Sequence, residues 1–346
     1  MSNLVACVES SSSIEGSLEK VIDLAGGFTP AADSSIVIKP NLCASHKGVG
    51  VTTDLEVVKA LVKYIRSRQK RCEITVVEGD SDSSATVAFK KLGYVEWAKK
   101  AGVKLKNISE DRVVKLLLPR GKRLRSLLVP ETLLFMDYFI SVACLKRQAA
   151  ERLTGIWKNQ YGCIPQKHVR LDLHPFMSEV LFDLNSVYWA DLSIMDARFG
   201  LEGSGPIEGT PKPVGLIMCS KNPLSTDVFA FGLVEKKAKK VPSIGYALRK
   251  GFSDSSRFQV VGKLDCQEIS LRYISRVQYI LYRLGMRFRR IGLYFVNIGT
   301  LFGVVAFALR VQKFEELAKG KLLPTAYWPR LAWHMITKFE TTQRNN

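Results

Sequence analysis

The sequence lacks paired cysteines at the spacing that metal sites use. Its seven cysteines, at positions 7, 43, 72, 144, 163, 219 and 266, include no Cys-x-x-Cys pair. We therefore expect neither a self-contained zinc or iron–sulfur site nor a disulfide framework. Unpaired cysteines suit a reducing compartment, and residues 1–10 show no basic-then-apolar signal pattern. These observations predict a cytoplasmic location for the bulk of the chain.

Acidic residues are also scarce, with 32 Asp and Glu against 51 Lys and Arg and a net charge of +19. Such an excess attracts anionic partners: phosphorylated small molecules, nucleic acid or an acidic membrane surface. Charge alone does not choose among these three. The length of 346 residues and the apolar content of 47% exclude a disordered chain and allow one large domain with an appendage.

Short β-rich runs alternate with helix-like segments through the first part of the chain. Strands are expected near residues 4–8, 36–39 and 73–77, with helices near 14–25 and 55–66 between them. Later strands are expected near 138–143, 192–195, 214–219 and 258–262. This order predicts an α/β fold with a mostly parallel open sheet and helices on both faces. Ligands bind such sheets at the carboxyl ends of the strands, so the polar residues there are the site candidates.

Polar residues follow the second and third expected strands. In Lys39-Pro40-Asn41 a cation and an amide flank an abrupt exit from the sheet and could hold an anionic group. The alternative is a strand-ending turn with Lys39 in solvent. Asp80 and Ser81, in the acidic and hydroxyl-rich segment 78–84, could coordinate magnesium or cap the next helix.

The segment 154–168 combines two lysines, an asparagine, a cysteine and a histidine around a Gly and a Pro. Lys158, which precedes Asn159, could clamp a phosphate or carboxylate, or act as a base if it is buried. His168 is a candidate general acid–base, because histidine changes charge near neutrality, or else a hydrogen-bonded structural residue. Cys163 is either a nucleophile stabilised by its basic neighbours or an ordinary buried cysteine.

A glycine-rich segment at 196–211 follows a later strand, and its four glycines within ten residues allow close approach of backbone to a ligand. Asp196 and Glu202 could bind a metal or a substrate ammonium, or could lie in solvent on a surface turn. The glycine order is not the dinucleotide-binding fingerprint. Asn222-Pro223 signals a helix start, and we expect Asp227 in that helix to face the same crevice.

The segments 39–41, 78–81, 154–168 and 196–209 together resemble the family called domain of unknown function 362, sometimes described as iron–sulfur-centre proteins. The resemblance covers residues 1–262. Many relatives carry a ferredoxin-type module with Cys-x-x-Cys runs, which this chain lacks. Relatives often show Pro-Lys-x-Lys-Thr-His where this chain has Arg147 and Gln148 at the Thr and His positions. The resemblance implies a pocket and leaves the cofactor and any metal unknown.

From Asp265 onward the chain changes character, which predicts a domain at 1–264 and a basic, apolar helical extension at 265–346. The extension has 13 basic and 5 acidic residues, and 291–309 contains no charged residue. As a helix these nineteen residues would rise about 28 Å, close to the hydrocarbon thickness of a bilayer. Attachment to a membrane, by spanning it or lying on it, is one interpretation. The other is a helix buried against the α/β body or a second subunit of a homo-oligomer.

The sequence favours a cytoplasm-facing, membrane-associated enzyme that binds an anionic small molecule at the strand ends. Its expected catalytic residues are Lys158, His168 and Asp196, and its expected ligand-binding residues are Lys39, Asn41, Asp80, Ser81, Asn159 and Glu202. A non-catalytic membrane-associated binding or scaffold protein is the second hypothesis. Nucleic-acid binding is the third and rests on the net charge, without a recognised motif.

Overall fold

The computed structural model describes residues 3–275, apart from 11–12, 47 and 253–256, together with residue 279. Met1–Ile274 forms one compact unit and Ser275–Asn346 a second. The apolar segment 291–309, on which the membrane prediction rests, lies outside the described residues. Within the part of the chain that is described, no helix is both long and apolar enough to cross a bilayer.

The described part of the first unit is built on a sheet of nine strands in the order β11-β1-β10-β9-β7-β2-β3-β4, with β8 paired to β7. Neighbours from β9 to β4 are parallel, whereas β10 is antiparallel to both of its neighbours. The predicted mostly parallel sheet is therefore confirmed. The strands are β1 (Asn3–Glu9), β2 (Ser35–Lys39), β3 (Glu73–Glu78), β4 (Lys104–Asn107), β7 (Tyr138–Gln148), β8 (Arg152–Thr154), β9 (Leu192–Glu202), β10 (Thr210–Ser220) and β11 (Phe258–Gly262).

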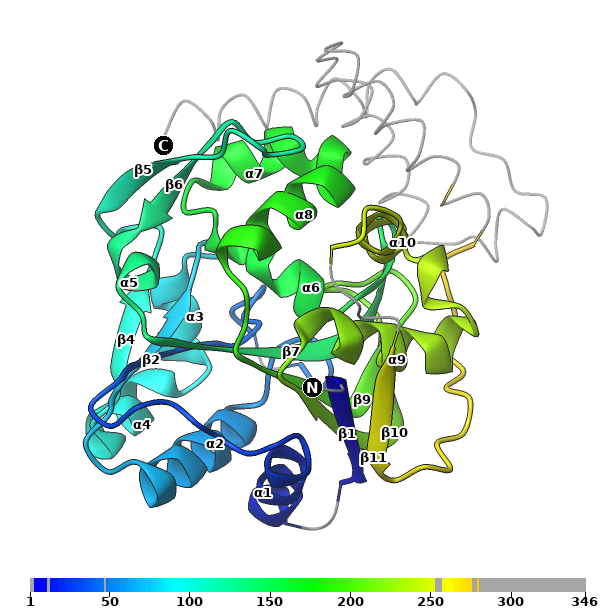
Figure 1. The fold of residues 1–346 in the computed structure, drawn as a ribbon, viewed down its shortest axis with the longest axis horizontal. Coiled ribbons are helices and arrows are strands. Elements are labelled where there is room, and N and C mark those ends of the chain that lie inside the picture. Colours follow the sequence, from blue (N-terminus) through cyan, green and yellow to red (C-terminus); the bar gives the residue numbers. More distant parts are fainter. Residues whose placement is uncertain (1–2, 11–12, 47, 253–256, 276–278, 280–346) are drawn as a thin grey trace, which may run out of the picture. The chain divides into compact units, whose positions relative to one another are not determined.

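Helices cover both faces of this sheet, as predicted (Figure 1). One face carries α1 (Ile14–Leu24), α2 (Leu55–Arg68), α3 (Ala85–Lys91) and α4 (Tyr94–Ala101). The other carries α6 (Ile156–Asn159), α8 (Met177–Val187), α9 (Pro223–Glu235) and α10 (Pro242–Arg249). Alternation along β2 supplies both cores, since Ile36 and Ile38 pack on the α2 side and Val37 on the α6 side.

Three segments complete the unit. The hairpin of β5 (Val113–Leu117) and β6 (Ser126–Pro130) is followed by the short helix α5 (Glu131–Leu134), and α7 (Lys167–Leu173) leads towards α8. Asp183 on α8 accepts hydrogen bonds from three successive backbone N–H groups of the basic loop between β5 and β6, those of residues 122–124. This buried carboxylate fixes a loop that would otherwise carry unsatisfied donors.

Two helix starts agree with the sequence, because Asp54 and Asn222 accept backbone N–H groups as the N-caps of α2 and α9. The glycine-rich segment differs from expectation. Strand β9 continues through Glu202, which pairs with Thr210 of β10, so the turn is confined to residues 203–209. Pairing with a neighbouring strand keeps this part of the segment extended despite its glycines.

Residues 265–274, which the sequence assigns to the extension, lie along the first unit. Leu271 is buried, and its carbonyl accepts two hydrogen bonds from Arg147 on β7. Arg272 forms an ion pair with Glu202 at the end of β9. The compact unit accordingly extends to Ile274.

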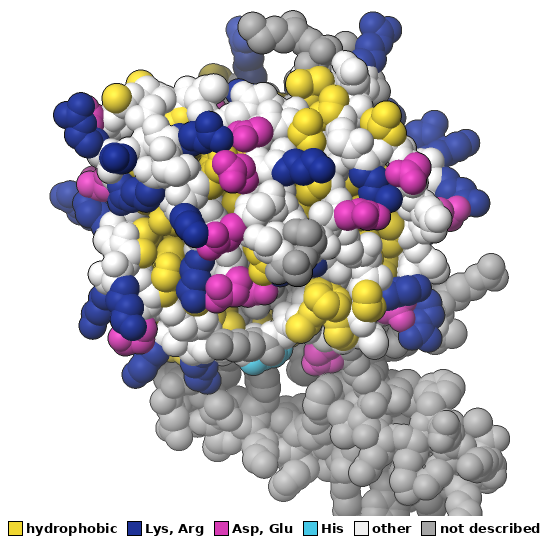
Figure 2. Space-filling model, turned by 90° about the horizontal axis from the view of Figure 1, so that it is seen from below, with side chains coloured by type: hydrophobic (Ala, Val, Ile, Leu, Met, Phe, Trp, Pro, Cys, Tyr) yellow, Lys and Arg dark blue, Asp and Glu magenta, His cyan; other side chains and the backbone are white. Residues whose placement is uncertain are grey.

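Basic and acidic side chains are interspersed on the face shown in Figure 2. On α1 and α2, exposed cations pair with carboxylates, as in Lys63–Glu15 and Arg68–Asp23. Such exposed pairs contribute little to stability, but they neutralise the local charge. The excess of basic residues therefore does not form a continuous strip over these two helices.

Candidate functional site

A buried ion pair lies where β2 and β3 end. Lys39 Nζ is 2.5 Å from Glu78 Oε1, and both side chains are almost completely buried. The other oxygen of Glu78 accepts the backbone N–H of Leu42 at 2.8 Å, and Oε1 also accepts that of Gly79 at 2.9 Å. Parallel pairing of β2 with β3 brings the two residues together across 39 positions of sequence. The alternative that placed Lys39 in solvent is thus wrong.

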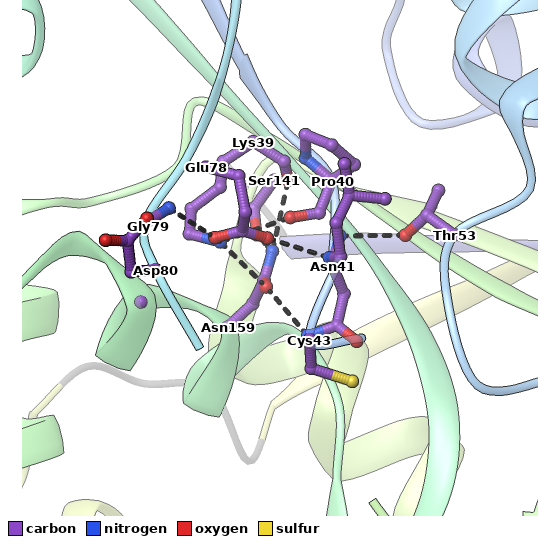
Figure 3. Close-up of polar contacts among 12 residues, drawn as sticks. Lys39, Pro40, Asn41, Cys43, Thr53, Glu78, Gly79, Asp80, Ser141 and Asn159 are labelled. Carbon is purple, nitrogen blue, oxygen red and sulfur yellow. Dashed lines mark hydrogen bonds and ion pairs between the residues drawn. The ribbon is translucent and has the colours of Figure 1, made fainter. Parts of the chain in front are cut away.

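Asn159 connects this pair to the neighbouring loop (Figure 3). Its amide oxygen lies 3.4 Å from both Lys39 Nζ and Asn41 Nδ2, and its amide nitrogen donates to the Lys39 carbonyl and to Ser141 Oγ. The network joins the ends of β2, β3 and β7 to α6. It therefore holds α6, which carries Lys158, in a fixed position at the carboxyl edge of the sheet.

Two glycines allow this close packing. A side chain at Gly162 would place its Cβ 2.9 Å from Lys39 Nζ and 3.1 Å from Glu78 Oε1. A Cβ at Gly79 would lie 2.6 Å from the carbonyl oxygen of Gly162. The absence of side chains at both positions lets two backbone segments approach the ion pair.

A cavity of ≈ 340 Å³ opens beside the pair at the ends of β2, β3 and β7. Five predicted residues line it: Lys39, Asn41, Ser81, Lys158 and Asn159. The basic side chains on its wall outnumber the acidic ones, which are Glu78 and Asp82. The basic residues are Lys39, Lys146, Lys158, Lys167 and Arg170.

Four of these cations have no carboxylate within ion-pair distance among the described residues, namely Lys146, Lys158, Lys167 and Arg170. Lys146 is 1% exposed and donates instead to Asn41 Oδ1 and the Val51 carbonyl, with Cys43 Sγ at 3.5 Å. Arg170 Nη1 donates to two carbonyls, those of residues 162 and 164. Lys146 and Arg170 are buried, and a buried cation without a counter-charge is costly, so these two residues favour a negatively charged group beside them.

Lys158 differs from the neighbouring Lys39 and Lys146 because its amine makes no hydrogen bond within the described structure, and its Nζ lies 5.8 Å from the centre of the Tyr161 ring. Burial lowers the pKa of Lys158 below the usual 10.5, and the charge of Lys146 adds to this, while Glu151 opposes it. Burial raises the pKa of the Cys163 thiol to about 12. A neutral, fully buried thiol fits an ordinary core cysteine and does not fit a thiolate nucleophile.

Comparison with known proteins identifies the family to which the sequence belongs. A family model described as a domain of unknown function (DUF362) matches residues 36–232. The chain belongs to the DUF362 family. The thylakoid-associated protein sll1697 of Synechocystis sp. is 24% identical over 257 residues, which make up 70% of this chain and 77% of that protein. The resemblance identified in the sequence is therefore confirmed at the level of the family.

Two solved structures are distantly similar to this DUF362 chain. The lactate racemase apoprotein from Thermoanaerobacterium thermosaccharolyticum matches with a TM-score of 0.37 and 11% identity, covering 57% of this chain and 51% of that one. A protein from Thermotoga maritima matches with a TM-score of 0.30 and 12% identity, covering 54% and 50%. The chain spans about half the length of each of these structures.

Asp80 and Ser81 lie at the rim of the site. Asp80 Oδ1 accepts the backbone N–H of Ala85 at 2.8 Å, at the start of α3, and an amide hydrogen of Asn107 at 3.0 Å. This agrees with the capping interpretation of Asp80. Within the described residues, no group of three or more His, Cys, Asp or Glu side chains is arranged to hold a metal ion.

The structure does not bring His168 to the cavity. His168 is exposed on α7, whereas His174, one residue beyond that helix, lines the wall and contacts the Tyr161 ring edge-on. The DUF362 segment 154–168 therefore delivers both of its lysines and its asparagine to the cavity but not its histidine. Lys167, Arg170 and Leu171 share one side of α7, and that side lines the cavity.

Asp196 faces a different cavity, of ≈ 520 Å³, on the α2 side of the sheet. It is buried and receives two hydrogen bonds from Arg198, which also contacts Asp54. Side chains alternate along β9, so Asp196 shares its face with Ile194 and not with Met195, which packs on the α6 side. The expectation that Asp196 and Lys158 line one crevice is therefore wrong.

Glu202 and Asp227 also have structural partners instead of cavity positions. Glu202 accepts the backbone N–H and Nε–H of Arg272, and this pairing lowers the pKa of Glu202. Asp227 is fully buried and accepts the backbone N–H groups of Ile156 and Trp157 at the start of α6. Asp227 thus supports the site by holding α6 in place and does not face the cavity.

The predicted site residues leave out several residues of the wall, among them Glu78, Lys146 and Arg170. Each had a recognisable signal. Glu78 is the carboxylate that closes an apolar strand, and Lys146 is a lysine that follows the apolar run 138–145. Arg170 follows His168 by two positions, and residues two apart point to different sides of a helix. Arg170 can therefore reach the cavity although His168 does not. An ionisable residue at the end of a buried strand is a site candidate even when the family motif departs from its usual form.

Proposed function

We propose that this protein binds a small anionic molecule in the cavity at the ends of β2, β3 and β7. The observation that carries the proposal is the set of four wall cations, Lys146, Lys158, Lys167 and Arg170, that have no carboxylate within ion-pair distance among the described residues. A phosphate or carboxylate would supply the missing counter-charge. Arg170 Nη1 is committed to two carbonyls, but its buried Nη2 has no partner among the described residues and could donate to such a group, while the lysines act as point charges.

Size and position support the same proposal. A volume of ≈ 340 Å³ is at the lower end of the range that small-molecule sites occupy, about 300–1,000 Å³. The cavity lies at the carboxyl edge of the parallel strands, where open α/β sheets bind their ligands.

Isothermal titration calorimetry of the full chain with inorganic phosphate and, separately, citrate tests the proposal. We expect saturable binding of at least one anion, and Lys146→Gln should weaken it about tenfold to a hundredfold, since a charge-assisted hydrogen bond is worth about 1.5–3 kcal/mol. Lys167 is exposed at the rim and makes no hydrogen bond among the described residues. Lys167→Gln should therefore weaken anion binding by only about twofold to fivefold.

The matched control is Lys99→Gln, which removes one exposed charge from α4, away from the cavity. Its affinity should equal that of the wild type. The thermal midpoint of each variant checks folding, and Lys167→Gln stays informative if Lys146→Gln is unstable. Binding of neither anion, or equal losses in Lys99→Gln and Lys167→Gln, would contradict the proposal.

We also propose that residues 291–309, with the basic residues on both sides, attach the protein to an acidic membrane surface. The supporting observations are nineteen uncharged positions next to Arg289, Arg290 and Arg310, and the relative named a thylakoid-associated protein. Basic residues beside an apolar segment favour anionic lipid headgroups. In this arrangement the anion cavity belongs to a protein that works at a membrane.

Co-sedimentation of the full chain with phosphatidylglycerol-containing vesicles, compared with pure phosphatidylcholine vesicles, measures this attachment. Arg289→Gln/Arg290→Gln should weaken binding to the acidic vesicles by about 1 kcal/mol for each residue. Lys99→Gln/Lys100→Gln removes the same charge from α4 and should change nothing. Equal sedimentation with and without vesicles would refute the attachment, and equal losses in the two double variants would assign it to net charge alone.

A further inference from the structure

Lys158 places a half-buried amine on the cavity wall. By contrast, Lys39 is held by Glu78, and Lys146 already donates to Asn41 and Val51. No hydrogen bond or ion pair of the Lys158 amine occurs among the described residues, and the face of the Tyr161 ring lies beside it. A lysine on a cavity wall that takes no part in the surrounding network is available to a ligand.

The backbone that carries Lys158 is fixed from both sides. Asp227 accepts the N–H groups of Ile156 and Trp157, and Asn159 is anchored to Lys39 and Ser141. Trp157 and Asn159 are both buried. Because its neighbours are immobilised, the lysine side chain starts from a defined position in the cavity.

The surroundings also make the neutral amine, which is the nucleophilic form of lysine, more accessible than it is in water. Burial lowers the pKa of Lys158 and outweighs the opposing charge of Glu151, and the ammonium of Lys146 lowers the pKa further. Desolvation and a neighbouring cation are the two ways in which proteins activate a lysine towards carbonyl carbon. The cationic wall that selects an anion therefore also activates an amine.

We propose that the anionic ligand carries an aldehyde or ketone group and that Lys158 captures it as an imine. The inference rests on the proposed function, because Lys146, Lys167 and Arg170 would hold the anionic end of the molecule. The neutral Lys158 nitrogen forms a bond to the carbonyl carbon, and one of its two protons passes to the carbonyl oxygen, which gives a carbinolamine. The nitrogen then gives up its one remaining proton to the departing hydroxyl group, which leaves as water, and the C=N bond forms. No oxidant or reductant is required.

Borohydride trapping tests the imine. The full chain is incubated separately with pyruvate, 2-oxoglutarate and pyridoxal 5′-phosphate, reduced with sodium borohydride and analysed by intact mass and peptide mapping. At least one compound should give a secondary amine at Lys158, formed faster than at the exposed Lys167, since burial lowers the pKa of Lys158 and so raises its free-amine population. Inorganic phosphate should slow the labelling by competition.

Lys158→Arg is the decisive variant, because arginine keeps the positive charge but cannot form an imine. It should lose the adduct. Lys99→Arg, an exposed lysine of α4 away from the cavity, should keep both the adduct and phosphate binding. Phosphate binding without an adduct at Lys158 from any of the three carbonyl compounds would overturn the imine and leave the proposed function intact. An adduct at Lys158 that phosphate does not slow, with no phosphate binding, would overturn the anion site and retain the imine. Absence of both would overturn both.

Discussion

Replacing Glu78 with glutamine should destabilise the protein by about 3–5 kcal/mol, because it leaves the Lys39 ammonium buried without its counter-charge. Lys39 is 1% exposed and Glu78 4%, so solvent cannot replace the lost partner. Glutamine has the size of glutamate and keeps one acceptor oxygen, so the variant tests charge more than shape. Denaturant unfolding of the full chain, followed by intrinsic fluorescence, measures the difference.

The control for this prediction is the exposed pair Lys59–Glu56 on α2. Glu56→Gln makes the same chemical change where water screens the charge, and it should cost less than about 1 kcal/mol. A double-mutant cycle with Lys39→Met adds a second check. The double variant should cost less than the sum of the single ones, by about 0.5–3 kcal/mol for groups in direct contact. A cost for Glu78→Gln no larger than that for Glu56→Gln would mean that the pair does not stabilise the fold.

The same ion pair marks the limit of what the sequence could predict at this site. The exit of β2 at Lys39 and Pro40 was predictable, because proline ends the strand. The partner of Lys39 was not, since it lies 39 residues away and reaches the lysine through the pairing of β2 with β3. Local polarity therefore left two alternatives open, an anion-binding lysine and a solvated one, and neither included the buried carboxylate that pairs with Lys39.

The direction in which side chains point accounts for the two larger differences between the predicted site and the structure. Sequence spacing located the strand ends but gave Asp196 and Lys158 a common crevice, although β9 turns Asp196 to the α2 side. His168 was chosen because histidine titrates near neutrality, but a single turn of α7 decides which side chains reach the cavity. Lys158 and Asn159 were located correctly because they lie on a short helix immediately after a strand hairpin at the sheet edge.

The second large effect comes from Asp227, the carboxyl group that holds α6 in place. We expect it to make the stability of the protein depend on pH. Burial raises the pKa of Asp227 from 3.8 to about 7, and its two hydrogen bonds from backbone N–H groups oppose this. Between pH 3.8 and about 7, Asp227 is therefore protonated to a greater extent in the folded state than in the unfolded state. Stability contributed by Asp227 is therefore complete below the unfolded pKa, falls as the pH rises through this window, and is constant above the folded pKa.

Asp227→Asn removes this titration. The amide keeps one acceptor for the two N–H groups of α6, so at pH 5 the variant should be less stable than the wild type by about 1–3 kcal/mol. The wild type should then lose stability relative to the variant by up to about 1.4 kcal/mol for each pH unit towards neutrality, which narrows or reverses the difference.

Thermal unfolding of both proteins from pH 4 to pH 8, with the exposed Asp172→Asn of α7 as the control, measures this dependence. The control should follow the wild type at every pH, because an exposed carboxyl group has a similar environment in the folded and unfolded states. A constant difference between the wild type and Asp227→Asn would show that Asp227 does not titrate in this range. If the difference does narrow, the charge on Asp227 acts through the N–H groups of residues 156 and 157, and the position of Lys158 in the cavity depends on the same carboxyl group.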